Sequence, residues 1–294
     1  RYQLVTGVQT CALPISGVEI AGALSEMKKY VLPKDYPDMP SSLMHIYLIE
    51  AGERLLPAMS PYSSAHVEKY LRSIGVNVLL NKIVTDYQDH RVILKDGSSI
   101  ATRTFIWVSG VAAQKVGNLD ASHLGRGARI KVNACNQVEG LDGVFCIGDQ
   151  CIMTEGDPNW QGGHPQLAQV AIQQGVLLAK NLQRLEKGKE MKAFRYRNLG
   201  TMATVGRNKA VAEFKKVHMA GFMAWFMWLV VHLRSILGVR NKIVVLLNWM
   251  WNYFSYGQSL RMIVYAKKAK EVVERERRLR SEERRVGKEC KHRC

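Results

Sequence analysis

A glycine near the start of the chain and a glutamate 33 positions later are residue types that dinucleotide-binding proteins use. Gly17 opens a stretch of small and apolar residues at helical spacing, and Glu50 ends a short apolar run. A glycine at a helix start lets the backbone approach a pyrophosphate, and an acid on the next strand accepts hydrogen bonds from ribose hydroxyls. Most of the glycine-rich turn is missing, so a helix followed by a strand with a solvated glutamate explains the pair about equally well. An acid at position 50 disfavours a 2′-phosphate and therefore favours NADH over NADPH.

Two further apolar runs end in small or acidic residues. Residues 104–110 stop at Ser109 and Gly110, and residues 143–149 stop at Gly148 and Asp149. We expect both runs to be strands whose tips lie at the carboxyl edge of a sheet, where dinucleotides bind in open α/β folds.

The cysteines allow a redox and a metal interpretation, and we favour neither. Cys146 and Cys151 are spaced like a redox dithiol, but one is expected in a buried strand, so small core residues are the preferred interpretation. The cluster Cys290, His292 and Cys294 fits no standard zinc spacing, and we predict no metal site. So few cysteines in the central chain favour a reducing compartment.

The surrounding pattern predicts the elements that must position these residues. Apolar periodicity indicates helices over 17–27, 61–73 and 165–185, and strands over 44–50 and from 75, 90 and 99. Asp96 and Gly97 predict a tight turn between two of these strands. Alternating helices and strands predict an α/β fold with a parallel sheet.

Positive charge is concentrated in the second half of the chain. The 42 basic and 25 acidic side chains leave a net charge of −2 on residues 16–179 and of +15 on residues 180–279. Aromatic and apolar runs bracketed by cations are typical of helices at a membrane interface, although a core helix pair is the alternative. The long apolar interruptions argue against nucleic acid as a partner. The expected membrane-facing residues are Trp225, Trp228, Arg234, Arg240, Lys242, Trp249 and Trp251.

Both ends of the chain resemble translated sequencing adapters. We therefore expect residues 1–15 and 280–294 to be foreign and the natural chain to run from Ser16 to about Leu279.

Segments spread over the natural chain resemble the type II NADH dehydrogenases, which pass electrons from NADH through FAD to quinone without pumping protons. The resemblance covers essentially all of residues 17–265. Its segments are Gly17–Leu24, Ile46–Leu56, Ile106–Val111, Val144–Asp149, Ala168–Gly175, Phe194–Ala212, Gly221–Leu233 and Asn248–Phe254.

The resemblance implies roles on the NADH side. Gly17 and Glu50 would hold the pyrophosphate and the adenosine ribose of NADH, and Ser109 and Gly110 would line the same cleft. Glu19 would be the family's acid near the nicotinamide and the quinone. An acid that stabilises a helix N-terminus is the alternative interpretation of Glu19.

It also implies roles on the flavin side. Asp149, beside Gly148, would accept a hydrogen bond from the ribityl chain of FAD. Ala168, Gln169 and Gln173 would lie beside the flavin ring and the quinone, where an amide can donate to a quinone carbonyl.

The resemblance finally implies a domain organisation and a setting. We expect an incomplete NADH-binding domain over 16–113, the carboxyl part of an FAD-binding domain over 114–190 and a membrane-binding region over 191–279. The chain would thus be a partial two-dinucleotide-binding-domain flavoprotein with an amphipathic helical anchor. It would lack the flavin half and the first NADH-domain strand, and would be inactive alone.

The intact protein would be a homodimer on the cytoplasmic face of the bacterial inner membrane, with quinone and anionic lipid as partners. The alternatives are a sulfide:quinone or disulfide oxidoreductase, or a non-catalytic protein that binds membrane surfaces.

Overall fold

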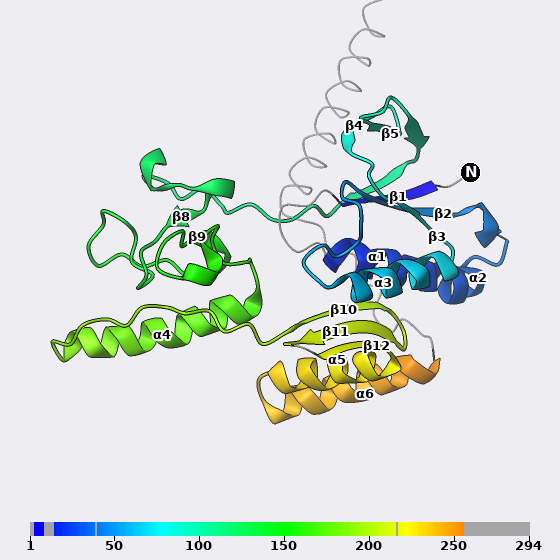
Figure 1. Cartoon of the computed structure of the whole chain (residues 1–294). Coiled ribbons are helices and arrows are strands. Elements are labelled where there is room, and N and C mark those ends of the chain that lie inside the picture. The colour runs from blue at the N-terminus through cyan, green and yellow to red at the C-terminus, as the bar shows by residue number, and fades with distance from the viewer. Residues whose placement is uncertain (1–2, 9–14, 39, 216, 256–294) are drawn as a thin grey trace, which may run out of the picture. The chain divides into compact units, whose positions relative to one another are not determined.

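A four-stranded parallel sheet forms the first part of the chain (Figure 1). The computed structural model describes residues 3–8, 15–38, 40–215 and 217–255. The strand order is β3 (Val76–Leu79), β2 (His45–Glu50), β1 (Gln3–Val8) and β7 (Thr104–Trp107). Helix α3 (Pro61–Ser73) connects β2 to β3, because parallel neighbours need a crossover rather than a hairpin. The predicted parallel α/β sheet is confirmed.

The central strand β1 corrects one sequence expectation. We expected the first strand of this domain to be absent, but Gln3–Val8 pairs in parallel with β2 on one side and with β7 on the other. Val5, Thr6 and Val8 are β-branched, which suits a strand, and the pairing closes the inner edges of β2 and β7. A backbone strand is therefore present at this place, while the adapter-like origin of residues 1–15 stays a prediction.

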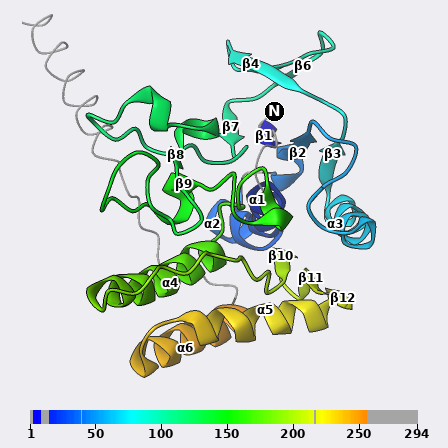
Figure 2. The same cartoon turned by 60° about the vertical axis from the view of Figure 1, so that its left-hand side comes forward.

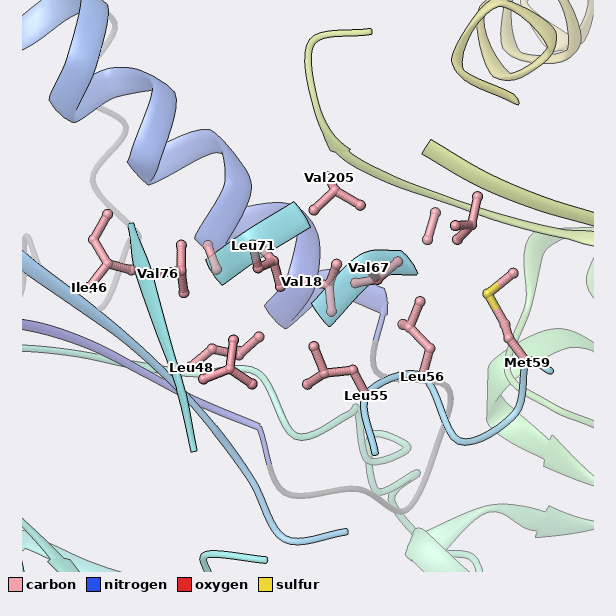
Figure 3. Packing of buried hydrophobic residues seen from close by; sticks show 14 of the residues in the cluster. Val18, Ile46, Leu48, Leu55, Leu56, Met59, Val67, Leu71, Val76 and Val205 are labelled. Atoms are coloured by element: carbon pink, nitrogen blue, oxygen red, sulfur yellow. The ribbon is translucent and has the colours of Figure 1, made fainter. Parts of the chain in front are cut away.

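Helices α1 (Ile15–Glu26) and α3 pack between the parallel sheet and a second sheet. Val18 of α1 and Leu71 of α3 meet Leu48 of β2 and Val205 of the second sheet in one buried cluster (Figure 3). The predicted helix 61–73 is confirmed and begins where Ser60 accepts a hydrogen bond from Ser63 N–H at 3.3 Å. After α1 the chain continues through a π-helical turn (Met27–Val31) into the short helix α2 (Leu32–Asp35).

The second sheet is antiparallel and consists of β10 (Thr201–Gly206), β11 (Lys209–Phe214) and β12 (Val217–Gly221). Alternation along β11 explains its two packed faces, since side chains point to opposite sides in turn. Val211 joins the cluster of α1 and α3, whereas Ala210 and Ala212 pack with Ala224 of helix α5 (Phe222–Ser235). This sheet therefore links α1 and α3 to the following helix.

A small antiparallel sheet and a loop-rich region complete the first part of the chain. The meander β4 (Val84–Gln88), β5 (Arg91–Leu94) and β6 (Ser99–Ala101) confirms the turn predicted at Asp96 and Gly97. Beyond β7 come two short paired strands, β8 (Ile130–Lys131) and β9 (Cys151–Ile152), and the long helix α4 (Ala168–Glu186). Single 3₁₀ turns lie at Ser41–Leu43, Ala121–His123, Arg126–Ala128, Gly148–Gln150 and Pro158–Trp160.

The strand predicted over 143–149 is not formed as a sheet strand. In the described chain this segment has a single bridge, between Gln137 and Phe145, and then enters the 3₁₀ turn Gly148–Gln150. Val144 remains 45% exposed. The apolar run correctly indicated extended backbone, but this segment pairs with a neighbouring segment along one edge only.

Backbone contacts divide the chain into a unit that ends at Val245 and a second that begins at Leu246. The division falls inside helix α6 (Val239–Ser255). This division does not test the bounds of the three domains expected from the sequence, which stay predictions.

Candidate functional site

The carboxyl end of β2 carries a buried acid. Glu50 is 1% exposed, and its Oε1 accepts a hydrogen bond from Gly52 N–H at 2.9 Å. Lys82 N–H donates to the Glu50 carbonyl at 3.0 Å, so the strand end is also held through its backbone. This arrangement fits the recognition of a ribose, because a fixed carboxylate at the carboxyl edge of a parallel sheet can accept hydroxyl hydrogen bonds.

Ser109 and Gly110 follow β7 at the same edge of the sheet. Val8 of β1 is in register with Glu50 of β2, and Gly7 of β1 is in register with Trp107 of β7. The carboxyl ends of β2 and β7 therefore lie at the same edge of the sheet, one on each side of β1. Gly110 has φ 116°, which lies in the region that favours glycine. The structure therefore brings the predicted Glu50, Ser109 and Gly110 to one edge.

Gly17 and Glu19 lie in the first turns of α1, with different surroundings. Gly17 is buried near the helix start, as a glycine at a tight helix approach should be. Glu19 Oε1 instead accepts hydrogen bonds from Thr204 N–H at 3.3 Å and from the Thr204 hydroxyl at 3.2 Å. The predicted acid thus contacts the edge strand β10.

Glu19 belongs to a stripe on α1 that covers β10. One turn on, a Cβ on Gly22 would lie 2.4 Å from the Val205 carbonyl oxygen, so only glycine permits the observed approach. One further turn on, the Glu26 carboxylate accepts a short hydrogen bond from Arg207 N–H. The two carboxylates accept hydrogen bonds from backbone N–H groups of Thr204 in β10 and of Arg207 just after it, a role the sequence did not reveal.

The turn predicted to meet the flavin is held by a buried amide. Gly148 has φ 72°, and its N–H donates to Gln174 Oε1 at 2.7 Å. Asp149 follows in the 3₁₀ turn, and its carbonyl accepts a hydrogen bond from Gln166 at 3.1 Å. The guanidinium of Arg129 interacts with Asp149, and its Nε is buried without a partner among the described residues. A buried donor beside an acid fits a polar ligand such as a ribityl or phosphate group.

The two glutamines predicted beside the quinone make paired backbone contacts. Gln173 donates to the Arg197 carbonyl at 2.9 Å and accepts from Arg197 N–H at 3.0 Å. Gln169 donates to the Gly200 carbonyl at 3.0 Å and accepts from Leu199 N–H at 3.1 Å. Each amide therefore acts as a strand partner for the extended segment after α4.

A third amide continues this pattern further along the helix. Asn181, fully buried, donates to the Lys192 carbonyl and accepts from Lys192 N–H, both at 2.9 Å. We call residues 192–200 the strap, which runs along α4 (Figure 2). The sequence showed a helix rich in Gln and Ala, but helical spacing alone did not show that three amides face one backbone segment.

A buried histidine–aspartate contact near the start of α4 was also missed. His164 Nε2 lies 3.1 Å from Asp157 Oδ2, and both side chains are 2% exposed. Burial disfavours the charged acid, but hydrogen bonds from Tyr196 N–H and from His164 outweigh it and keep the pKa of Asp157 below its usual range. The pair joins the loop before α4 to the strap. The only sequence signal was His164 preceding a proline.

The predicted membrane-facing residues lie on α5 and α6. On α5, Phe222 and Phe226 are about half exposed, while Trp225 and Trp228 are partly covered. On α6, Trp251 is 67% exposed, and Trp249 is partly covered. The cations Arg234 and Arg240 are exposed, and Lys242 is partly covered. Among the described helices, none is both long and apolar enough to cross a bilayer.

No group of three metal-ligating side chains occurs among the residues that the structure describes. The cluster Cys290, His292 and Cys294 lies outside those residues.

Comparison with known proteins identifies the family. A family model described as pyridine nucleotide-disulphide oxidoreductase matches residues 15–175, more than half of the chain. The chain belongs to this family. The NDH2 C-terminal domain model matches residues 198–256, which includes the second sheet and α5. Together with the relatives below, these matches confirm the resemblance to the type II NADH dehydrogenases.

Curated relatives are similar over most of this chain. The type II NADH:quinone oxidoreductase NdhA of Mycobacterium tuberculosis is 32% identical over 262 residues, 85% of this chain and 54% of the relative. The mitochondrial internal alternative NAD(P)H-ubiquinone oxidoreductase A1 of Arabidopsis thaliana is 30% identical, over 84% of this chain and 51% of the relative. The chain spans about half the length of these relatives.

Solved structures share the fold. The structure of NDH2 from Plasmodium falciparum in complex with NADH superposes with a TM-score of 0.76 at 15% sequence identity, covering 88% of this chain and 67% of that chain. The predicted dinucleotide-binding α/β fold is confirmed. The membrane-anchoring role of the terminal helices stays a prediction.

Proposed function

We propose that this chain is part of an FAD-dependent NADH:quinone oxidoreductase of a respiratory chain. Glu50 carries the proposal: it is a buried, backbone-fixed carboxylate at the carboxyl edge of a parallel sheet, in a chain of this family. The names of the curated relatives support this function over sulfide:quinone or disulfide oxidoreductase activity. When bound, FAD would supply the redox chemistry by accepting a hydride from NADH and passing two electrons to a quinone.

On the NADH side, the proposed task of the chain is to bind and orient. Glu50 accepts the hydrogen bonds of the adenosine ribose, and Gly17 lets the α1 backbone approach the pyrophosphate. Ser109 and Gly110 line the same edge. Glu19 is the proposed acid on the side of the nicotinamide and the quinone, held in place by Thr204.

On the flavin side, Gly148 and Asp149 would hold the ribityl chain, and Ala168 would lie beside the flavin ring. Gln169 and Gln173 each use one amide hydrogen on the strap. The second hydrogen of each amide is the proposed donor to a quinone carbonyl, where negative charge develops during reduction.

Nucleotide binding tests the Glu50 assignment. Glu50→Gln preserves the size of the side chain but removes its charge, and we expect NADH affinity to fall by about 10- to 100-fold, the cost of a charged hydrogen bond. Glu53→Gln, an exposed acid nearby, is the matched control and should bind like the unaltered chain. Isothermal titration with NADH and NADPH measures both effects. Equal affinity for the two nucleotides, or no effect of Glu50→Gln, would contradict the assignment.

The redox activity is tested in a longer protein, in which this chain is joined to the part that the curated relatives have and this chain does not cover. We expect it to oxidise NADH with a water-soluble quinone and to contain FAD. Failure to reduce any quinone would overturn the proposed activity and leave the nucleotide result untouched.

We further propose that the protein binds the anionic surface of the bacterial inner membrane from the cytoplasm, as a homodimer. The exposed aromatic residues of α5 and α6 and the nearby cations support the membrane part, at about 1 kcal/mol for each basic side chain near the surface. Trp251→Ser should weaken co-sedimentation with vesicles containing phosphatidylglycerol. Trp107→Ser, an exposed tryptophan on β7, is the control, and equal losses would contradict the proposal.

A further inference from the structure

A hollow of about 310 Å³ lies between the last turns of α4 and the start of the strap. None of the residues assigned above to NADH or FAD lines it. Its volume is at the lower end of the range for ligand sites, about 300–1,000 Å³. Five cationic side chains surround it, from Lys180, Arg184, Lys187, Lys189 and Lys192, and no acidic residue is among the described residues around it.

The backbone holds these cations around the hollow. Gly188 has φ 64°, its N–H donates to the Leu185 carbonyl at 2.9 Å, and Lys189 N–H donates to the Arg184 carbonyl at 2.9 Å. These are the two hydrogen bonds of a Schellman motif, in which a left-handed glycine ends the helix. Lys192 N–H donates to Asn181 at 2.9 Å, which holds the start of the strap against α4. The fold therefore fixes the backbone of these residues without a ligand.

The requirements of a helix end explain only part of this charge. A cation near a helix C-terminus interacts favourably with a partial charge of about half a unit, and the effect is confined to the last turn. Arg184 also ties the turn to the helix, because its Nε donates to the Glu190 carbonyl at 2.6 Å. An apolar contact frequently accompanies a Schellman motif, but here Arg184 and Lys189 occupy its two positions. The four lysines are therefore more than the helix end needs.

The five cations have no acidic partner among the described residues. The salt bridges of the described chain involve other side chains. Glu186 and Glu190, the acids of this segment, are exposed and form none of them. Like charges gathered around one hollow repel each other and attract an anion into it.

A buried amide adds an independent sign of a ligand. Asn181 lines the same hollow and is fully buried. One hydrogen of its amide donates to the Lys192 carbonyl at 2.9 Å, and the other has no acceptor in the part of the chain that the structure describes. A buried donor without an acceptor costs free energy, which an oxygen atom in the hollow would recover.

We propose that this hollow binds a soluble polyphosphate anion, with two or more phosphate groups. The proposal goes beyond the proposed function and needs neither FAD, NADH nor quinone. Lysine ammonium groups bind phosphate as point charges, and several of them match an anion with several negative charges. Among the described residues around the hollow, Leu177 alone is apolar, so the lining favours a soluble anion over a lipid headgroup with acyl chains.

Isothermal titration with inorganic triphosphate at low salt tests the proposal. We expect micromolar affinity that weakens as salt is added, because ions screen exposed charges. Lys187→Glu together with Lys189→Glu should lower the affinity by more than about tenfold, since two charged contacts are lost. Lys95→Glu together with Lys115→Glu is the matched control: it changes the net charge equally at two other exposed lysines and should bind like the unaltered chain.

A second variant separates binding from folding. Lys187→Gln together with Lys189→Gln removes the two charges without adding acids, and its affinity should lie between those of the unaltered chain and the glutamate variant. Circular dichroism should give the same helix content for all of these proteins, because the Schellman hydrogen bonds come from the backbone. Equal losses in the glutamate variant and its matched control, or no binding of triphosphate by the folded unaltered chain, would overturn the proposal.

Vesicles that contain phosphatidylglycerol distinguish a lipid source of phosphate from a soluble one. We expect the Lys187 and Lys189 glutamate variant and its matched control to co-sediment with these vesicles equally. A larger loss for the Lys187 and Lys189 variant would assign the phosphate to a lipid headgroup and overturn the proposed soluble ligand.

Discussion

Replacing Gly22 by alanine should separate α1 from the edge strand β10. The added Cβ would lie 2.4 Å from the Val205 carbonyl oxygen and 2.7 Å from its carbon, and both atoms are backbone and cannot rotate away. Restoring a normal carbon contact of about 3.5 Å requires β10 to retreat by roughly 1 Å. That shift also breaks the two hydrogen bonds that the Thr204 N–H and hydroxyl donate to the Glu19 carboxylate, which are already long at 3.3 and 3.2 Å.

The expected loss follows from these contacts. Overpacking costs about 1–3 kcal/mol, and each lost hydrogen bond to a carboxylate costs about 1.5–3 kcal/mol. The better helix propensity of alanine returns about 1 kcal/mol. We expect the free energy of unfolding to fall by about 3–8 kcal/mol, which lowers the urea midpoint by about 1–3 M at a slope of about 3 kcal/mol per M.

Urea unfolding followed by circular dichroism measures this change, with Gly175→Ala as the matched control. Gly175 is also inside a helix, α4, but its added Cβ would meet only Ile147 Cδ1 at an ordinary 3.7 Å. The control should therefore gain up to about 1 kcal/mol. A midpoint for Gly22→Ala at or above that of the unaltered chain would refute a contact too close for a methyl group.

Three further substitutions have distinct expected outcomes. Gln173→Leu leaves the N–H and carbonyl of Arg197 without their amide partner, and we expect the free energy of unfolding in urea to fall by about 1–3 kcal/mol. The control is Gln183→Leu, on the exposed side of α4, which should change that free energy by less than about 0.5 kcal/mol. Burial opposes ionisation of Glu213, but hydrogen bonds from two serines lower its pKa, so the stability it provides is present above about pH 4.5 and is lost as the pH falls through the lowered value. Glu213→Gln should therefore flatten the dependence of the urea midpoint between pH 6 and pH 3, and an unchanged slope would contradict this. Asp157→Asn removes the charge of a buried carboxylate that contacts His164 and accepts a hydrogen bond from Tyr196 N–H, and it should cost about 1.5–3 kcal/mol, seen as a lower thermal midpoint; an unchanged midpoint would contradict this.

The elements that follow from local chemistry were predictable from the sequence. The helix after Ser60 begins at a capping serine followed by Pro61, and the strand ending at Glu50 is a short apolar run between breakers. The sheet edge that gathers Glu50 and Gly110 follows from parallel topology, which alternating elements imply. The sheet edge that carries these residues was therefore predictable from the sequence, while their roles in nucleotide binding stay predictions.

The contacts between distant segments were not predictable in the same way. The expected place of Glu19 near the nicotinamide stays a prediction, and its observed partner, Thr204, which is 185 positions away in the chain, could not be foreseen. Residues 143–149 resemble a buried strand, yet burial depends on neighbours on both edges, which a single run of residues does not reveal. Gln169 illustrates the same limit, because a helical glutamine can point to a ligand or to a backbone segment at equal cost in local energy.

The strap also determines where this region can tolerate mutation. Because Gln169, Gln173 and Asn181 bind its peptide groups and not its side chains, strap positions such as Arg197 can change identity without losing a hydrogen bond. Proline is the exception, since it has no N–H to donate. In a saturation mutagenesis library selected for folded protein, substitutions of the three helical amide residues should be depleted, while most substitutions of Arg197 should be retained. The polar residues of α4 thus specify the path of this segment through its peptide groups, whereas the side chains of Phe194 and Tyr196, which are buried in a core cluster, and Gly200 remain constrained.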